Sequence, residues 1–240
     1  MTKTLSIDIG GSKVKAMVLD EAGQSITPRE RTKTPQPATP QNILDAAHGL
    51  AEKLGEFHRI SVGFPGAVRH GVIETAPNLD PSWRHFNLEE ELSARLGAPA
   101  KVANDATVQG FGAISGQGVE LVLTLGTGLG SALFVDGVSV PNLELAHHPF
   151  RYGKSYEDLL GQKALDRDGK KKWNKRLDKA VKQLFDLFYY DALLLGGGNA
   201  EYIDFDLPET ARRIPNISGI LGGVALWDPS AIGTAAVSVD

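Results

Sequence analysis

The sequence predicts an α/β protein built from two lobes. Segments with strand and helix patterns alternate along the 240 residues, which favours a mixed α/β class. A strand, a glycine-rich turn and a second strand follow one another at residues 5–20 and again at 119–140. The two units share an architecture without sharing a sequence, so we expect one unit in each lobe.

Composition limits the class of protein. Hydrophobic residues make up 42% of the chain and charged residues 22%, which is ordinary for a soluble globular protein. The net charge of −4 argues against nucleic acid as the main partner. The absence of cysteine excludes disulfides, thiolate catalysis and cysteine-rich zinc sites, and fits a reducing compartment. Without a signal peptide or a run of about 20 apolar residues, we expect a cytoplasmic protein with no membrane partner.

The first lobe is expected to span residues 1–106. Its alternating and helically spaced apolar residues predict a regular order of elements. They are a hairpin at 5–20, a strand after Gly23, an extended loop at 32–40, a helix at 42–57, a strand at 60–64, a helix at 87–96 and a strand at 100–103.

The second lobe is expected to span residues 107–225. A strand at 192–195 follows a long helix that carries apolar residues on one face and lysines on the other. The apolar face comprises Trp173, Leu177, Val181, Leu184, Phe185 and Phe188. The tail at 220–239 is small, apolar and partly helical in pattern, and a helix over about 226–240 is expected to complete the first lobe.

The first glycine turn is a candidate phosphate site. It joins two strands, unlike the strand-to-helix P-loop, and glycines let backbone N–H groups approach an anion closely. Asp8 precedes the turn, where its carboxylate is suited to hold a hydrated Mg²⁺. The candidate donor-binding residues are Gly10, Gly11, Ser12, Lys13 and Lys15. An ordinary hairpin explains the same pattern.

The second glycine turn is more informative. Three glycines and two threonine hydroxyls in one strand-to-strand turn suit anion binding, and two such turns would hold a phosphoryl donor from both sides. The candidates here are Thr124, Gly126, Thr127 and Gly128. Gly196, Gly197 and Gly198 follow a buried strand and add a third place of close approach, although a tight turn or helix C-cap explains them nearly as well.

Asn104 and Asp105 are the candidate catalytic pair. They end a strand at the junction of the lobes, where a carboxylate would accept the proton of an attacking hydroxyl. The Asn104 amide has the donors and the acceptor that vicinal hydroxyls need. A helix N-cap explains the same two residues. Glu144 and His147 are three residues apart, so they would face a polyol from one side of a turn.

Together these motifs resemble the ROK family of sugar kinases, which has the actin/hexokinase-like (ribonuclease H-like) fold with its active site in the interlobe cleft. The matching segments are 8–13 (DIGGSK), 63–66 (GFPG), 103–106 (ANDA), 125–130 (LGTGLG), 144–147 (ELAH) and 195–198 (LGGG). Segments 64–71, 124–137 and 140–144 are similar to the polyphosphate glucokinase branch of the family.

The resemblance implies a glucokinase of carbohydrate metabolism (glycolysis), with Asp105 as general base toward the C6 hydroxyl of glucose. It implies that the sugar contacts are Asn104, Glu144, His147, Glu157, Pro65 and Gly66. The glycine turns would hold Mg²⁺ and the phosphates of inorganic polyphosphate, ATP or both. The alternatives are a kinase for mannose or an N-acetylhexosamine, and a sugar sensor without turnover. We also expect a homodimer.

Three departures from the family pattern bear on these expectations. The cysteine-rich zinc motif of many ROK members is absent, so no zinc is expected. Ala146 replaces the usual glycine and His148–Pro149 follows it, which leaves the pose of the sugar open. No winged-helix segment precedes residue 1, so a DNA-binding repressor is not expected.

A cluster of cations between 163 and 182 suggests a track for a polymeric phosphate, with a solvated helix face as the alternative. It comprises Lys163, Lys170, Lys171, Lys172, Lys175, Arg176, Lys179 and Lys182.

Overall fold

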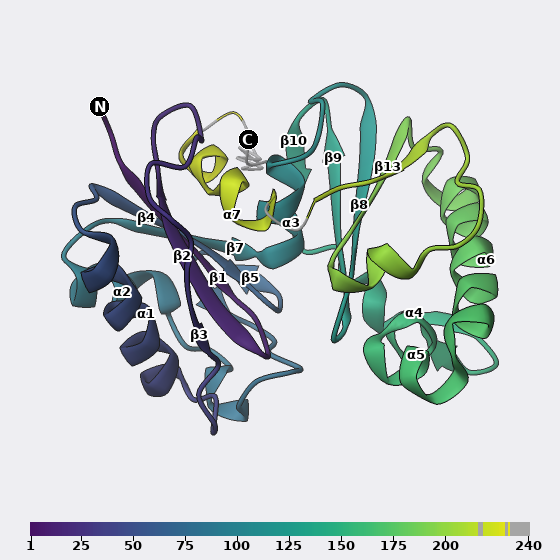
Figure 1. The fold of residues 1–240 in the computed structure, drawn as a ribbon, viewed down its shortest axis with the longest axis horizontal. Coiled ribbons are helices and arrows are strands. Elements are labelled where there is room, and N and C mark those ends of the chain that lie inside the picture. Colours follow the sequence, from purple (N-terminus) through teal and green to yellow (C-terminus); the bar gives the residue numbers. More distant parts are fainter. Residues whose placement is uncertain (216–217, 229, 231–240) are drawn as a thin grey trace, which may run out of the picture.

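The computed structural model describes residues 1–215, 218–228 and 230, and its fold is a two-sheet α/β arrangement (Figure 1). Within these residues, one five-stranded sheet has the order β3-β2-β1-β4-β7 and the other has the order β10-β9-β8-β13-β14. The first sheet is formed by β1 (Thr4–Ile9), β2 (Lys13–Leu19), β3 (Glu30–Lys33), β4 (Arg59–Phe64) and β7 (Ala100–Asn104). The second is formed by β8 (Val119–Leu125), β9 (Leu129–Val135), β10 (Val138–Val140), β13 (Ala192–Gly196) and β14 (Ala211–Arg213).

The first sheet combines a hairpin with parallel strands. β1 pairs antiparallel with β2 and parallel with β4, which pairs parallel with β7. On one face, α1 (Pro40–Leu54) and α2 (Leu88–Leu96) pack against Leu5, Ile7 and Ile9 of β1. On the other face lie α7 (Ser218–Leu221) and η4 (Gly222–Trp227), because Ser6 and Ser61 donate hydrogen bonds to carbonyls of this segment at 2.7 and 2.6 Å.

The second sheet repeats the plan. β8 and β9 form the second hairpin, and β13 pairs parallel with β8. The apolar face of α6 (Lys170–Phe188) packs on this sheet through Trp173 and Leu177. α3 (Asp105–Phe111) contacts both sheets and lies between them in Figure 1. α3 lies close to β9 because Gly110 has no side chain, and a Cβ there would lie 2.4 Å from the Phe134 ring.

Short elements connect these layers. They are β5 (Val68–Arg69), β6 (Val72–Ile73), η1 (Pro81–Trp83), η2 (Leu145–His147), β11 (Pro149–Arg151), β12 (Lys154–Ser155), α4 (Tyr156–Leu160), α5 (Gln162–Asp168) and η3 (Gly198–Tyr202). In the part of the chain that the structure describes, no helix has the length and apolar character needed to span a bilayer.

Several element boundaries differ from the expected ones for local reasons. α1 begins at Pro40 because the Thr39 side chain caps it, and it ends at Leu54 before Gly55. The strand expected over 131–140 is two strands, β9 and β10, because Asp136 and Gly137 turn the chain with φ of 50° and 81°. Phe185, expected on the apolar face of α6, is 38% exposed.

The structure describes the tail only in part. The segment that covers the first sheet consists of α7 and η4. η4 is a 3-10 helix that ends at Trp227. Of the helix expected over about 226–240, residues 229 and 231–240 lie outside the described residues. The lobe boundaries at 106 and 225 stay predictions.

We predict that Gly222→Ala destabilises the protein by about 1–3 kcal/mol. A Cβ at Gly222 would lie 1.9 Å from the Val108 carbonyl oxygen of α3, so the backbones must separate. Gly49→Ala in α1 is the control, since its Cβ meets nothing within 4 Å and alanine favours a helix. Urea unfolding measures both variants. Equal stability of the two would mean that η4 and α3 are not in close contact.

Candidate active site

A polar pocket of about 220 Å³ contains most of the predicted site residues. Its walls come from β1 and its glycine turn, the start of α3, the β8–β9 turn, η2 and α4. The predicted residues that line it are Asp8, Gly10, Gly11, Lys15, Pro65, Gly66, Asn104, Asp105, Thr124, Gly126, Thr127, Gly128, Glu144, His147, Glu157 and Gly197. Residues separated by up to 189 positions (Asp8 to Gly197) therefore meet at one place.

Four predicted donor contacts do not line the pocket: Ser12, Lys13, Gly196 and Gly198. Lys13 is exposed at the start of β2. Gly196 ends β13, where its missing side chain leaves space for the Gln109 amide, 2.6 Å from the position of a Cβ. Gly198 begins η3. Gly196 thus has a role in packing, and donor binding by these four residues stays a prediction.

Asn104 is the N-cap of α3. Its Oδ1 accepts from Ala106 N at 2.9 Å and Thr107 N at 3.4 Å, and its Nδ2 donates to Gly66 O at 3.1 Å. The alternative interpretation of Asn104 as a cap is therefore correct. The oxygen is used within the protein, which leaves one Nδ2 hydrogen for a ligand.

Asp105 follows the cap and is the first residue of α3. Its pKa is raised to about 7, first because burial disfavours the charged carboxylate and second because Asp8 carries a negative charge nearby. Glu144 also raises this pKa, while the Ala106 N–H and Lys15 lower it. The carboxyl thus changes protonation near neutral pH, which suits a group that accepts a proton.

Asp8 and Lys15 form an ion pair at 2.6 Å on neighbouring strands. Mg²⁺ commonly binds one or two carboxylates together with substrate phosphates and water. Asp8 and Asp105 in one pocket fit such a partial ligand set, and the described residues contain no group of three or more His, Cys, Asp or Glu that would hold a metal by themselves.

The β8–β9 turn is supported by contacts with Glu157 of α4 and with Gly197. Glu157 Oε2 accepts from Leu129 N at 3.0 Å, and a Cβ at Gly128 would lie 2.3 Å from that oxygen. A Cβ at Gly197, whose φ is 86°, would lie 2.2 Å from the Leu125 carbonyl oxygen. These glycines are required for close packing, so Glu157 and Gly197 support the turn whether or not they also contact a ligand.

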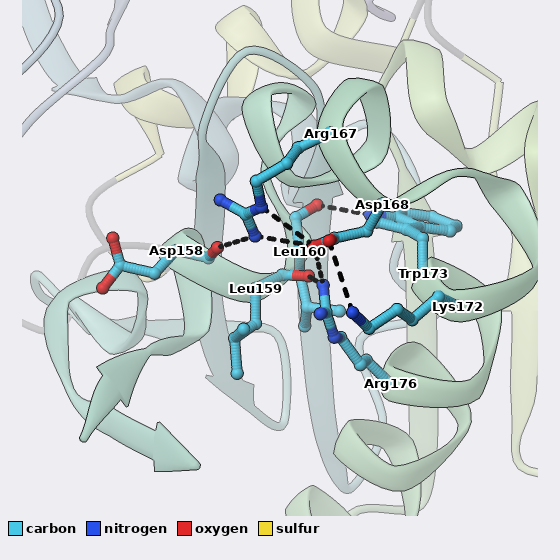
Figure 2. Close-up of polar contacts among 8 residues, drawn as sticks. All are labelled: Asp158, Leu159, Leu160, Arg167, Asp168, Lys172, Trp173 and Arg176. Carbon is cyan, nitrogen blue, oxygen red and sulfur yellow. Dashed lines mark hydrogen bonds and ion pairs between the residues drawn. The ribbon is translucent and has the colours of Figure 1, made fainter. Parts of the chain in front are cut away.

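α4, which carries Glu157, is anchored by the side chains drawn in Figure 2. Asp168 at the end of α5 pairs with three cations: Arg167 at 2.7 Å, Arg176 at 2.7 Å and Lys172 at 3.4 Å. The last carbonyls of α4 accept hydrogen bonds, at 3.5 Å from Arg167 to Asp158, 3.4 Å from Arg176 to Leu159 and 2.8 Å from Trp173 to Leu160. These contacts satisfy a helix end that would otherwise lack partners.

Glu144 is the N-cap residue of η2 and His147 is its last residue, and both line the pocket. Their side chains approach to 3.9 Å between Oε2 and Nε2. Burial raises the pKa of Glu144, whereas His147 lowers it. Asn142 joins this segment to the first half of the chain, because its side chain exchanges hydrogen bonds of 3.1 and 2.9 Å with the backbone of Val68.

Three polar residues of the pocket were not predicted: Asn78, Gln109 and Ser131. Asn78 follows Pro77 in a turn, and its Nδ2 lies 3.3 Å from the position of a Cβ at Gly128. Gln109 is buried one helical turn after Asp105, a spacing visible in the sequence. Ser131 faces Leu143 from β9 through a hydrogen bond to its carbonyl.

The model of the ROK family matches residues 4–140. The chain belongs to the ROK family. Polyphosphate glucokinase of Mycobacterium tuberculosis is 32% identical over 233 residues, covering 90% of this chain and 88% of that protein. Glucokinase of Streptomyces coelicolor is 36% identical over 145 residues, covering 56% of this chain and 44% of that protein.

Solved structures agree with this assignment. The inorganic polyphosphate/ATP-glucomannokinase of Arthrobacter sp. strain KM has a TM-score of 0.85 and 32% identity, covering 93% of this chain and 97% of that one. A ROK glucokinase of Streptomyces griseus, with glucose and AMPPNP, has a TM-score of 0.78 at 21% identity, with 93% and 98% covered. The expected fold class is therefore confirmed.

We predict that Asp105→Asn changes how stability depends on pH. Between about pH 4 and pH 7 the folded protein retains a proton that the unfolded chain has released, so the free energy of unfolding of the wild type falls as pH rises through this window. The Asp105→Asn variant has no titrating carboxyl at this position, so its free energy of unfolding should not show this fall. Denaturant unfolding at pH 5 and pH 8 measures the difference, and the exposed Asp186→Asn serves as control. Parallel changes in all three proteins would contradict the raised pKa.

Proposed function

We propose that the protein is a glucokinase that transfers a phosphoryl group from inorganic polyphosphate, ATP or both to the 6-hydroxyl of glucose. One observation carries the proposal: a carboxyl group with a pKa of about 7 lies in a pocket between two glycine turns. Membership of the ROK family and the similarity to polyphosphate glucokinases support it.

Asp105 is the proposed general base. In its ionised form it accepts the hydroxyl proton while the oxygen attacks phosphorus. The neighbouring Asp8 is paired with Lys15, so its charge is partly balanced when Asp105 ionises. Mg²⁺, when bound by Asp8 and the donor, would neutralise charge that develops on the transferred phosphoryl group.

The proposed sugar contacts surround Asp105. Glu144 offers an acceptor and His147 a nitrogen that donates or accepts, from one wall. The free Nδ2 hydrogen of Asn104 and the amide of Asn78 reach the pocket from the other half of the chain. Since Glu157 Oε2 already accepts from Leu129 N, its remaining oxygen is the one available to a hydroxyl.

The donor is proposed to lie along the glycine turns. Gly10, Gly11 and the 126–128 turn line the same pocket from the two sheets. The N–H groups of Gly10 and Gly126 donate to carbonyls within their own turns, so the phosphate contacts are proposed for the N–H groups of Gly11, Thr127 and Gly128. A kinase for mannose or an N-acetylhexosamine remains the second candidate, favoured by the name of the Arthrobacter enzyme for mannose. The Mg²⁺ requirement, the homodimer and the cytoplasmic location also stay predictions.

We predict that Asp105→Asn lowers phosphoryl transfer by about 10²–10⁴-fold, because the proton acceptor is lost, and leaves sugar binding largely intact. The measurement is a matrix of polyphosphate and ATP against glucose, mannose and N-acetylhexosamines, with Asp186→Asn as the control. More than about a tenth of wild-type turnover in the variant would assign the base to another residue. If the wild type transferred phosphate with no combination of donor and sugar, the result would favour the alternative of a sugar sensor without turnover.

We predict that Glu144→Ala and His147→Ala raise the KM for the sugar and leave the KM for the donor nearly unchanged. Loss of a hydrogen bond to a ligand hydroxyl costs about 1–3 kcal/mol, or roughly 5- to 150-fold in affinity. His148→Ala is the matched control, because His148 is exposed and does not line the pocket. A normal sugar KM in both variants would show that the sugar lies elsewhere.

A further inference from the structure

We propose that four cations on β2 and β3 form a binding surface for the part of a polyphosphate chain that extends out of the active-site pocket. This inference rests on the proposed use of polyphosphate and extends it beyond the pocket. The surface, called here the β2–β3 cation group, consists of Lys13, Lys15, Arg31 and Lys33.

The strand register brings the four residues together. β2 and β3 pair antiparallel, with Lys13 directly opposite Lys33 and Lys15 directly opposite Arg31. Neighbouring strands lie about 4.8 Å apart, and alternate residues of a strand about 6.8 Å apart. The four side chains therefore start from a small rectangle on one face of the sheet. Nothing in the linear sequence places 13 beside 33.

This face is the one that continues into the pocket. Side chains alternate along a strand, and Val14 and Ala16 point to the opposite face, where they are buried with Ile43 of α1. Lys15 lies on the same face as the other three members of the group, and it lines the pocket beside Asp8. Lys13, Arg31 and Lys33 are exposed.

The end of β3 is fixed to the glycine turn. Thr34 donates from its backbone N to Ser12 O at 3.1 Å and from its hydroxyl to Gly10 O at 2.5 Å. Arg31 and Lys33 are thus held at a defined position beside Gly10 and Gly11, which line the pocket. An anionic chain that leaves the pocket over this turn meets the cation group directly.

Three of the four cations in the group carry charge that no ion pair among the described residues neutralises. Like charges directly opposite one another in a sheet are destabilising. Among the described residues, Lys13, Arg31 and Lys33 are in no ion pair, and Lys15 pairs only with Asp8. An unbalanced set of cations, in register and next to a phosphate site, is the arrangement that binds a polyanion through release of its counterions.

The chemistry favours a long phosphate chain over a nucleotide. Polyphosphate carries charge along its whole length, so phosphates beyond those held by the glycine turns remain available for Arg31 and Lys33. The charge of ATP ends with its third phosphate, and the rest of the molecule is a nucleoside. Contacts outside the pocket therefore distinguish the two donors.

The cations of α6, which the sequence singled out for this role, are placed less favourably. Lys172 and Arg176 pair with Asp168 (Figure 2), Lys182 pairs with Asp178 at 2.8 Å, and no residue of α6 lines the pocket. Lys170 lies 3.9 Å from the centre of the Tyr202 ring. The β2–β3 cation group is smaller, but it adjoins the donor site, since Lys15 itself lines the pocket.

The test uses Arg31→Gln and Lys33→Gln, each compared with Lys53→Gln, which removes one exposed charge from α1 on the opposite face of the sheet. We expect each β3 variant to raise the KM for long-chain polyphosphate about two- to fivefold at low salt. The slope of log KM against log salt should fall by about 0.7–0.9 per variant. The double charge-preserving variant Arg31→Lys/Lys33→Arg should behave as the wild type.

ATP and tripolyphosphate are the companion donors. Their KM values should stay within about twofold of the wild type, because neither reaches far beyond the pocket. Unchanged kinetics with long polyphosphate, or equal losses with ATP, would overturn the proposal while the glucokinase function stands. The triple variant Lys170→Gln/Lys171→Gln/Lys172→Gln tests α6 as the competing binding site. If it weakened the use of long-chain polyphosphate while the variants at 31 and 33 did not, the polyphosphate-binding surface would lie on α6.

Direct binding separates this proposal from the function on which it rests. Fluorescence anisotropy of labelled long-chain polyphosphate, measured without sugar, should show weaker binding by Arg31→Gln and Lys33→Gln than by Lys53→Gln. A wild type that phosphorylates glucose from ATP but neither binds nor uses polyphosphate would refute the polyphosphate donor and the cation group together. A wild type that uses polyphosphate while all variants bind equally would refute the cation group alone.

Discussion

The site depends on the junction at which β7 becomes α3. Asn104 ends the strand and caps the helix, so Asp105 has a fixed place on the first turn. Gly63 on the neighbouring β4 allows the helix start to lie close, since a Cβ there would be 3.3 Å from Asp105 Cα. Behind the helix, the missing side chain of Gly222 lets η4 lie close to the Val108 carbonyl of α3. Because both sheets contact α3, the packing of the whole molecule determines where the carboxyl lies.

That position has an electrostatic consequence. Asp8, Asp105 and Glu144 share one pocket, in which Lys15 pairs with Asp8 and His147 approaches Glu144 to 3.9 Å. Burial raises the pKa values of both Asp105 and Glu144. The charges of Asp8 and Glu144 further raise the pKa of Asp105, and the charge of Glu157 further raises that of Glu144. A phosphoryl-transfer site gains from this arrangement, because a base with a pKa near the working pH accepts a proton and later releases it. The same repulsion favours binding of a cation or a hydroxyl donor in the pocket.

The sequence was sufficient for the parts of the site that depend on local chemistry. Both glycine turns, the Asn104–Asp105 pair and the strands that carry them lie where periodicity and turn residues predicted. It was insufficient where a residue type has several uses. A glycine signals close approach without saying to what. The structure shows that Gly196 lies against Gln109, while its assignment to a phosphate stays a prediction. Asn78 was missed because it lies in a loop, and the path that brings a loop residue to the pocket depends on tertiary packing.

Charge illustrates the same limit most clearly. The cations of α6 are clustered in the sequence and easy to notice, yet Asp168 and Asp178 lie within reach of several of them in the fold. Lys13, Lys15, Arg31 and Lys33 are dispersed in the sequence, and only the pairing of β2 with β3 makes them one group. The field at a surface depends on which opposite charges lie within a few ångströms, since water and salt screen more distant ones. A count of lysines along the chain therefore says less about where a polyanion binds than the register of two short strands.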